Sequence, residues 1–381
     1  MSNPFRAEIR RFYGFMEFPE RTVAEIDAVK TVVGNNFTVV NVYLEAGILT
    51  FEVAETEIKE RFKRCLTQLK SLGYIATARK ENEVVKIRVF PYVRPSKNNI
   101  KVPVILGLAT VLTVSLDGFL RSNSRLYAVI MPGYGVQDVF LNGLIFSAAL
   151  LAIIFIHEMG HKLSARLDGV SASHPYFIPG FPGIIPTLGA VIFQKEPLAN
   201  RDDMFDIGVS GPVAGFTASL VVTFTAFETA VWLPADQYMK VLETAAREGS
   251  IVEVPLIFSF IRLLYGRADQ FPFFMTVGFA AWLGMVVTAL NLMPIWQLDG
   301  GRIFRSFLTR RQHVIASYVA LGILVITGYY FMALLLILMM GRSVDIAPLD
   351  EVSPLSFWRK VSIIGLVAML VLSFVPLNRI F

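Results

Sequence analysis

Two histidines and a glutamate at the end of an apolar stretch are the residues of this chain best suited to chemistry. The sequence HEMGH at 157–161 places His157 and His161 on one helix face, one turn apart, where they can hold zinc. Glu158 can then act as general base toward a water molecule that the metal activates. Residues 139–156 carry no charge and approach the length that a bilayer requires. The motif therefore predicts metal-assisted hydrolysis inside a membrane or at its rim.

A catalytic zinc site needs a third protein ligand, and Asp299 is the best candidate. It lies in NLMPIWQLDGG, directly after another apolar segment, and is expected at the same membrane face as the histidines. Pro294 should end the preceding helix, and the two glycines after Asp299 allow a tight turn. The alternative is that Asp299 caps a helix over 301–309. The HEMGH sequence in a paired span favours the ligand role.

Other residues that can bind metals have simpler explanations. His174 is expected to be an interface histidine, since three ligands are already assigned, and His313 needs no special role. Cys65 is the only cysteine, which excludes an intrachain disulfide. It falls on the apolar face of a predicted helix and is expected to be a small core residue.

The composition indicates a membrane protein. Of 381 residues, 54% are hydrophobic and 17% are charged, with a mean hydropathy of +0.57, whereas soluble domains carry about 25% charged residues. Residues 1–101 hold 17 Lys and Arg against 12 Asp and Glu, and the rest of the chain holds 18 of each. A water-soluble segment that faces the cytoplasm and anionic lipid is therefore expected. Its basic and acidic residues alternate, so no nucleic-acid partner is expected.

Residues 1–97 are expected to form a small α/β domain with the order α-β-β-α-β-β. Apolar periodicity predicts helices over 22–33 and 55–72, and turn signals at 46–47 and 81–82 predict two hairpins. The domain shows no cluster of residues that suggests chemistry. A docking or regulatory role, with a partner protein bound there, is the expectation.

Residues 98–381 are expected to form the membrane domain, with a catalytic core over about 102–340. Six segments approach the length that a bilayer requires: 102–120, 139–163, 207–233, 273–295, 314–340 and 359–377. Residues 254–265 are too short to span and are predicted to form an interfacial helix. The alternative, that they do span, would invert the topology of everything after them. The fold class is thus a polytopic α-helical membrane protein of about six transmembrane helices with a small N-terminal α/β domain.

Two basic connections set the expected orientation. Arginines cluster in 297–313, and lysines and arginines flank 164–206, so the positive-inside rule puts both connections in the cytoplasm. With six spans, both termini also lie there, in a multi-pass protein of the cell membrane. Water would reach the HEMGH motif from the same side.

Two further segments have patterns of their own. Residues 174–193 are apolar but contain four prolines and three glycines, which predicts a membrane-dipping loop or hairpin that lines the site. An ordinary hydrophobic connector is the alternative. Gly208, Gly211 and Gly215 have the small-residue spacing that lets helices pack closely in lipid.

The HEMGH motif in the second span and NLMPIWQLDGG in the fourth resemble the site-2 protease family of intramembrane zinc metalloproteases. The resemblance covers roughly residues 102–340. The N-terminal domain and the closing QLDGG are most similar to archaeal and plant-plastid members. The resemblance implies one zinc ion held by His157, His161 and Asp299, with Glu158 as general base and proton shuttle.

The same resemblance implies a transmembrane helix of another protein as substrate, which must unwind before cleavage. It implies an edge strand within 174–193 that pairs with the unwound substrate, and a third span that lies against the catalytic pair. Asn291 matches a polar family residue that holds the substrate backbone or stabilises the oxyanion. A plain polar contact between helices is an equal alternative for Asn291. A catalytically silent scaffold and a proton or metal relay are the competing functions.

Overall fold

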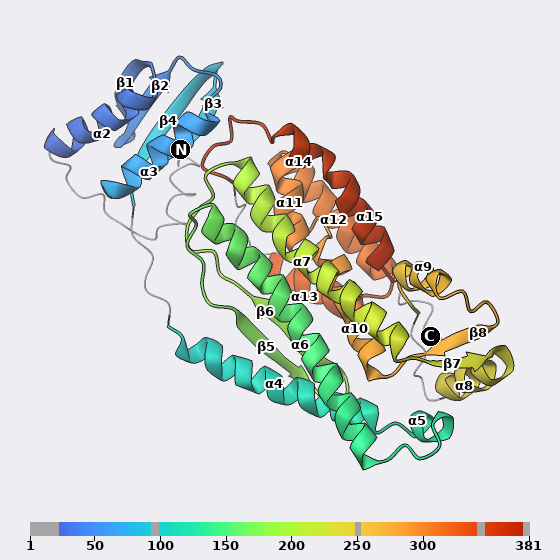
Figure 1. The fold of residues 1–381 in the computed structure, drawn as a ribbon. Helices are drawn as coiled ribbons and strands as arrows, with labels where there is room; N and C mark the ends of the chain where they lie inside the picture. The colour runs from blue at the N-terminus through green and yellow to red at the C-terminus, as the bar shows by residue number, and fades with distance from the viewer. Residues whose placement is uncertain (1–22, 93–98, 248–252, 297, 341–346, 376–381) are drawn as a thin grey trace. The chain divides into compact units, whose positions relative to one another are not determined.

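The polypeptide forms two compact units. The first comprises Met1–Arg94 with Leu349–Pro354, and the second comprises Pro95–Pro348 with Leu355–Phe381. The structure is a computed structural model that describes residues 23–92, 99–247, 253–296, 298–340 and 347–375. Figure 1 shows the elements of both units.

In its described residues, the first unit is a four-stranded antiparallel sheet with two helices. Its strands follow the order β1-β2-β4-β3. The elements are α2 (Val23–Asn36), β1 (Val39–Glu45), β2 (Ile48–Val53), α3 (Lys59–Ser71), β3 (Tyr74–Glu81) and β4 (Val84–Pro91). The predicted order α-β-β-α-β-β is therefore confirmed. Gly47 has a φ of 83° at the first predicted turn, a left-handed conformation that glycine adopts without strain.

The core of this unit forms where α3 packs on the sheet. Four residues of α3 are buried at helical spacing: Phe62, Cys65, Leu66 and Leu69. Phe51 of β2 is also fully buried. Burial raises the pKa of the Cys65 thiol to about 12, because a thiolate loses its hydration there. Cys65 is thus the small core residue that the sequence predicts.

The first unit includes a segment from far along the chain. The Ala78 N–H of β3 donates to the Leu349 carbonyl (2.8 Å), and the Glu351 N–H donates to the Ala78 carbonyl (3.2 Å). Arg79 adds an ion pair with Glu351 (Nε to Oε2, 3.1 Å). Residues 349–351 thus form a short bridge with the open edge of β3, which the sequence did not predict.

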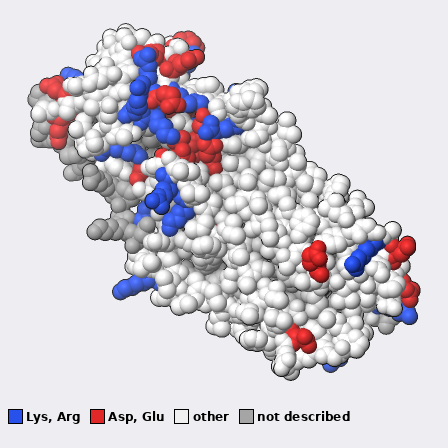
Figure 2. Space-filling view, viewed as in Figure 1, with Lys and Arg blue, Asp and Glu red and all other residues white. Residues whose placement is uncertain are grey.

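Three helices dominate the second unit. They are α4 (Lys101–Ser122), α6 (Val136–Leu167) and α7 (Arg201–Glu228). Among the described residues, these three are long and apolar enough to cross a membrane. On the face that Figure 2 shows, charged side chains gather over β1–β4 and neighbouring loops, and much of the helical surface carries none. A helical, membrane-associated unit is therefore confirmed.

The predicted set of six spans is not confirmed. The fourth corresponds to α10 (Thr276–Asn291), which is apolar but has 16 residues. The fifth, predicted as one helix over 314–340, is instead two helices, α12 (Arg310–Ile326) and α13 (Tyr330–Met340). Gly328 separates them with a φ of 90°, a left-handed conformation that ends helices.

The sixth predicted span is also divided. Its residues form α14 (Phe357–Val361) and α15 (Ile363–Ser373), and its last two predicted residues, 376–377, lie outside the described ranges. The third is shifted, because α7 begins at Arg201 after an Asn200 N-cap whose side chain accepts from the Asp203 N–H. Hydropathy located these apolar segments, but not their helix ends.

Short elements connect the helices. They are α5 (Arg125–Ile130), β5 (Tyr176–Phe181), β6 (Ile185–Val191), β7 (Val231–Pro234), α8 (Ala235–Arg247), α9 (Leu256–Leu264), β8 (Gln270–Phe273) and α11 (Asp299–Phe307). β5 and β6 pair antiparallel, so the predicted hairpin within 174–193 is present. The short helix predicted over 254–265 is α9. Its place at a membrane interface stays a prediction.

Small residues let α6 and α7 approach closely. A Cβ added to Gly160 of α6 would lie 2.5 Å from the Ser210 carbonyl oxygen of α7 and 3.0 Å from the Ala214 Cβ. Such contact needs glycine, as expected for helices that pack in lipid. Figure 1 shows the two helices side by side, and this crossing lies within the HEMGH sequence.

Candidate metal centre

Helix α6 positions both histidines. They lie ten and six residues before its C-terminal end, on a continuous helix without proline, so their i, i+4 spacing puts them on one face. Their Nε2 atoms are 3.3 Å apart. Both side chains are buried, with relative exposures of 6% for His157 and 8% for His161.

Asp299 completes a three-residue group. Its Oδ2 lies 3.2 Å from His157 Nε2 and 3.1 Å from His161 Nε2. Among the described residues, His157, His161 and Asp299 form the group of His, Cys, Asp or Glu side chains that could hold a metal. Their ligand atoms all lie within 4.8 Å of one another. The structure thus brings together the three residues that the sequence singled out, across 142 residues of chain.

A hydrogen bond defines the state of His161. Its Nδ1 lies 2.7 Å from the Ile207 carbonyl oxygen of α7, and a carbonyl can only accept, so Nδ1 carries the proton. In the neutral imidazole, Nε2 then presents a lone pair toward Asp299 and His157. Lone pairs held this close repel unless a proton or a metal ion lies between them, and carbonyl-oriented histidines are typical of metal ligands.

The spacing of the ligand atoms fits zinc. A tetrahedral zinc with bonds of about 2.0–2.1 Å has ligand atoms about 3.3 Å apart, and the three measured separations run from 3.1 to 3.3 Å. Nitrogen and carboxylate oxygen are donors that zinc accepts. The residues present therefore fit a zinc ion with a fourth position open.

Two glycines of α7 make room for the histidine rings. A Cβ on Gly211 would collide with the His161 ring, and a Cβ on Gly215 would lie 2.8 Å from His157 Nδ1. A Cβ on the third glycine, Gly208, would lie 3.0 Å from Ile303 Cγ1 of α11. The predicted close packing and the predicted place of the third span against the histidines are both confirmed.

Glu158 and Asn291 lie beside this group. Glu158 is buried, with a relative exposure of 5%, and interacts electrostatically with both histidines and with Asp299. Asn291 ends α10, and its Nδ2 is 3.4 Å from His157 Nε2. The structure thus places both residues at the site without testing the roles predicted for them.

The alternative that Asp299 caps a helix is wrong. Asp299 is the first residue of α11, and the N-cap position belongs to Leu298. The glycines after it serve close packing, since a Cβ on Gly300 would collide with the backbone of Leu292 and one on Gly301 with the backbone of Ile295. Helix α10 ends before Pro294, as predicted.

The remaining histidines lie apart from the group. His174 Nδ1 is 3.5 Å from Lys162 Nζ, outside the ligand set, as expected. His313 is buried against Trp296, with ring centroids 5.6 Å apart, and so has a packing role.

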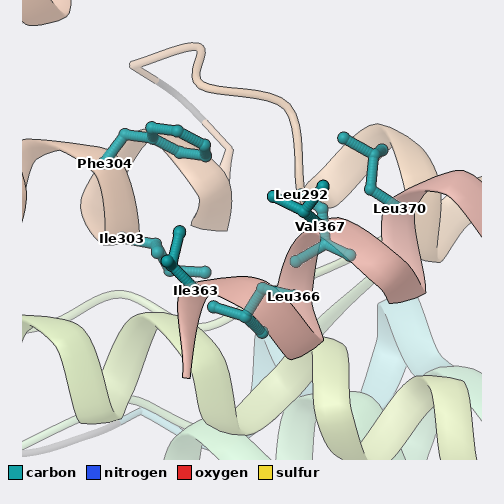
Figure 3. Close-up of a pocket in the computed structure, with 7 residues that line it drawn as sticks. All are labelled: Leu292, Ile303, Phe304, Ile363, Leu366, Val367 and Leu370. Carbon is teal, nitrogen blue, oxygen red and sulfur yellow. The ribbon is translucent and has the colours of Figure 1, made fainter. Parts of the chain in front are cut away.

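A small apolar pocket lies on another side of α11. Leu292, directly after α10, and residues of α11 and α15 surround it (Figure 3): Ile303, Phe304, Ile363, Leu366, Val367 and Leu370. The lining consists of aliphatic and aromatic side chains, so the pocket holds no group that suits acid–base chemistry. Its walls instead support the helix that carries Asp299.

Comparison with known proteins agrees with this geometry. The model of peptidase family M50 matches residues 145–335, which is half of the chain and includes all three candidate ligands. The chain belongs to peptidase family M50. No solved structure gives a significant match.

Several curated relatives are plant proteins. The chain is similar to the probable zinc metalloprotease EGY2, chloroplastic, of Oryza sativa subsp. indica, at 27% identity over 254 residues, covering 64% of this chain and 44% of the relative. It is similar to the probable zinc metalloprotease EGY1, chloroplastic, of Oryza sativa subsp. japonica, at 30% identity over 247 residues, 60% of this chain and 40% of the relative. The corresponding Arabidopsis thaliana EGY1 is 30% identical over 241 residues. The chain thus spans less than half the length of these relatives.

Sequence reasoning missed the supports of the ligands. The Ile207 carbonyl that orients His161 has no side-chain signature. The fit of Gly211 and Gly215 against imidazole rings looks like ordinary helix packing in the sequence. The small residues of DIGVSGPVAG and the family resemblance marked the segment, but neither indicated these contacts.

Proposed function

We propose that this protein is a zinc-dependent intramembrane endopeptidase that cleaves transmembrane helices of other proteins within or near the membrane. One observation carries the proposal: the ligand atom of Asp299 converges with those of His157 and His161, and both histidines lie in a helix long and apolar enough to span a bilayer. Membership of peptidase family M50 and the names of the plant relatives support it.

In this proposal the two histidines and Asp299 hold one zinc ion. When bound, zinc would polarise the scissile carbonyl and make a water molecule more acidic. Glu158 takes the proton of the attacking water and returns it to the leaving amine as the C–N bond breaks. Asn291, beside His157, holds the substrate backbone or the developing oxyanion through its amide N–H groups.

The burial of the site favours a substrate that arrives within the membrane. A helix hides its carbonyls in its own hydrogen bonds, so the substrate must unwind locally before attack. The β5–β6 hairpin offers strand edges with which an unwound segment can pair. Lipid surrounds the six apolar segments in the proposed arrangement, with both termini and access to the site on the cytoplasmic side.

The first unit takes a docking or regulatory role in this proposal. Its described residues contribute none of the members of the metal-binding group, and its basic balance suits a place near anionic head groups. A partner protein would bind there, and nucleic acid would not. The cell membrane remains the proposed location of this chain, although the names of its plant relatives carry the word chloroplastic.

Zinc content is the first measurement to make. The protein purified in detergent should carry about one zinc ion per chain, as expected for a catalytic site, and Asp299→Ala should lose most of it. The matched control is Asp269→Ala, which removes an exposed aspartate outside the group and should retain zinc.

Each other outcome counts against part of the proposal. No zinc in the folded wild type would contradict the protease and favour a scaffold. Zinc retained in Asp299→Ala would show that another residue is the third ligand. Zinc transport without cleavage of any membrane protein would favour the relay.

A further inference from the structure

Asp117 is a buried acid that the proposed chemistry does not use. It lies in α4, one of the three helices fit to span a membrane, and its relative exposure is 0%. Ionisable residues are expensive within a bilayer and mark functional positions by default. It also lies outside the metal-binding group.

Both carboxylate oxygens of Asp117 are engaged. Oδ1 accepts from the Gly183 N–H (2.7 Å) at the tip of the β5–β6 hairpin, and Oδ2 accepts from Arg121 Nε, one turn along α4. Arg121 reaches the same tip through the Ile184 carbonyl (Nη2 to O, 3.5 Å). Its guanidinium lies 4.1 Å from the centroid of the Phe279 ring. The pair thus joins the hairpin tip to α4.

The tip has a conformation that suits this contact. Gly183 has a φ of 87°, which glycine adopts without strain and which presents its N–H to Asp117. The tip is otherwise apolar, since Phe181 and Ile184 are 67% and 75% exposed. Asp117 and Arg121 therefore supply the polar contacts that hold an apolar tip in place.

The hairpin follows α4 over much of its length. A Cβ on Gly107 would lie 4.0 Å from Phe177, near the start of β5. Asp117 binds the tip ten residues further along the helix, a rise of about 15 Å. The hairpin is thus held at a fixed depth along the helix.

The anchor is itself fixed to α6. Next to Asp117, a Cβ on Gly118 would lie 2.7 Å from the Gly143 carbonyl oxygen of α6 and 3.1 Å from Ser147 Oγ. Ser147 precedes His157 by ten residues of the same helix, again about 15 Å. The close contact of α4 with α6 at Gly118 therefore fixes the position of the hairpin tip along α6 relative to the metal centre.

We propose that Asp117, with Arg121, is a positioning residue that sets the depth of the β5–β6 hairpin and thereby which peptide bond of the substrate meets the metal centre. This inference rests on the proposed function. A substrate strand paired with the hairpin takes its register from it, and registers that keep the same face differ by two residues. A released hairpin therefore permits cleavage at neighbouring bonds.

A spin label at the tip tests the anchor without any cleavage assay. Ile184→Cys places the label at an exposed position, and the buried Cys65, whose thiol pKa is raised to about 12, should not react. The label should be immobile in the otherwise wild-type chain and at least about twofold more mobile, by spectral line width, in Asp117→Leu. Thr113→Val is the matched control, because Thr113 Oγ1 bonds to Thr110 within α4. Equal mobility in Asp117→Leu and the control would overturn the anchor.

Cleavage of a transmembrane peptide, mapped by mass spectrometry, tests the consequence. Asp117→Leu should keep its zinc, raise KM about tenfold or more, and add cleavage sites about two residues from the original. Asp117→Asn keeps an oxygen for the Gly183 N–H and should restore the original site. Unchanged sites with a mobile label would overturn the register role, and lost zinc would show a merely structural one. If the wild type cleaves nothing, the proposed function fails, while the label still decides the anchor.

Discussion

At the scale of single residues, the site depends on which ring nitrogen of His161 carries the proton. The Ile207 carbonyl fixes the proton of His161 on Nδ1, so the opposite nitrogen faces Asp299 and His157 with a lone pair. Three electron-rich atoms then lie within hydrogen-bond distance of one another. A metal ion would bind all three atoms at once, which is why zinc content is the primary observable.

Glu158 is the residue that separates metal binding from catalysis. Glu158→Gln keeps the size and the burial of the side chain but cannot accept the proton of water. Cleavage should fall by about 10² to 10⁴, while zinc content stays at the wild-type level. Peptide cleavage and elemental analysis on the same preparation measure both. Substantial cleavage by Glu158→Gln would assign the general base to another group.

Gly211 tests whether α7 shapes the site. In Gly211→Ala the new methyl group would collide with the His161 ring, so the ring must move and zinc affinity should fall by about tenfold or more. Competition with a zinc chelator measures the affinity. Gly322→Ala is the matched control, because no atom lies within 4 Å of the added methyl group and zinc affinity should not change. Equal affinities in the two variants would contradict the contact.

At the scale of elements, an ion-pair cluster holds α14 against the start of α7. Arg359 pairs with Asp206 (Nη2 to Oδ2, 2.5 Å) and with Asp202 (Nη1 to Oδ2, 3.1 Å), and Asp202 also accepts from the Ser356 N–H. Asp202 is buried. Seven residues past Arg359, Leu366 lines the pocket beside α11, so the cluster helps hold the helix that supports Asp299.

Removal of Arg359 should loosen this contact. Arg359→Met removes the charged partner of the buried Asp202, which costs about 1–3 kcal/mol and should lower the unfolding temperature in detergent. Lys360→Gln is the control, since Lys360 is exposed and its loss should have little effect. A scan of thermal unfolding on both variants decides. Equal unfolding temperatures would show that the cluster adds nothing to stability.

Elements were predictable where the signal is local. A short stretch of sequence was enough to predict the structure of three segments: HEMGH, the uncharged residues before it and the proline-rich 174–193. The break at Gly328 was missed because hydropathy stays high on both sides and a single left-handed residue leaves no mark on it. The start of α7 was missed because its first turn is polar, with Asp202 and Asp203 behind the Asn200 cap.

At the scale of the whole molecule, long-range pairing lies beyond what sequence patterns show. Asp299 was found because its own motif is distinctive. The bridge between Ala78 and residues 349–351 joins segments about 270 residues apart. Neither segment has a sequence pattern that indicates the other as its partner. The Asp117–Gly183 contact is equally hard to predict from the sequence, since each residue alone has an ordinary explanation.

The first unit should lose stability in acid. Arg88 is buried and donates two hydrogen bonds to Glu81, Nη1 to Oε1 (2.8 Å) and Nη2 to Oε2 (2.9 Å). These bonds are the main cause that holds the pKa of Glu81 below its ordinary value of 4.5. A folded-state pKa below the unfolded value stabilises the fold above the unfolded pKa, and this stability is lost as the pH falls through the folded value.

Hydrogen exchange on the full chain measures this loss in β3 and β4. Protection factors of their amides should hold from neutral pH to about pH 5 and fall below about pH 4.5. Glu81→Gln cannot titrate, so it should start with lower protection and lose less of it over the same range. The same acid-dependent loss in wild type and Glu81→Gln would show that Glu81 is not the titrating group. A smaller loss in Glu81→Gln would show that one buried arginine links the stability of the sheet to pH.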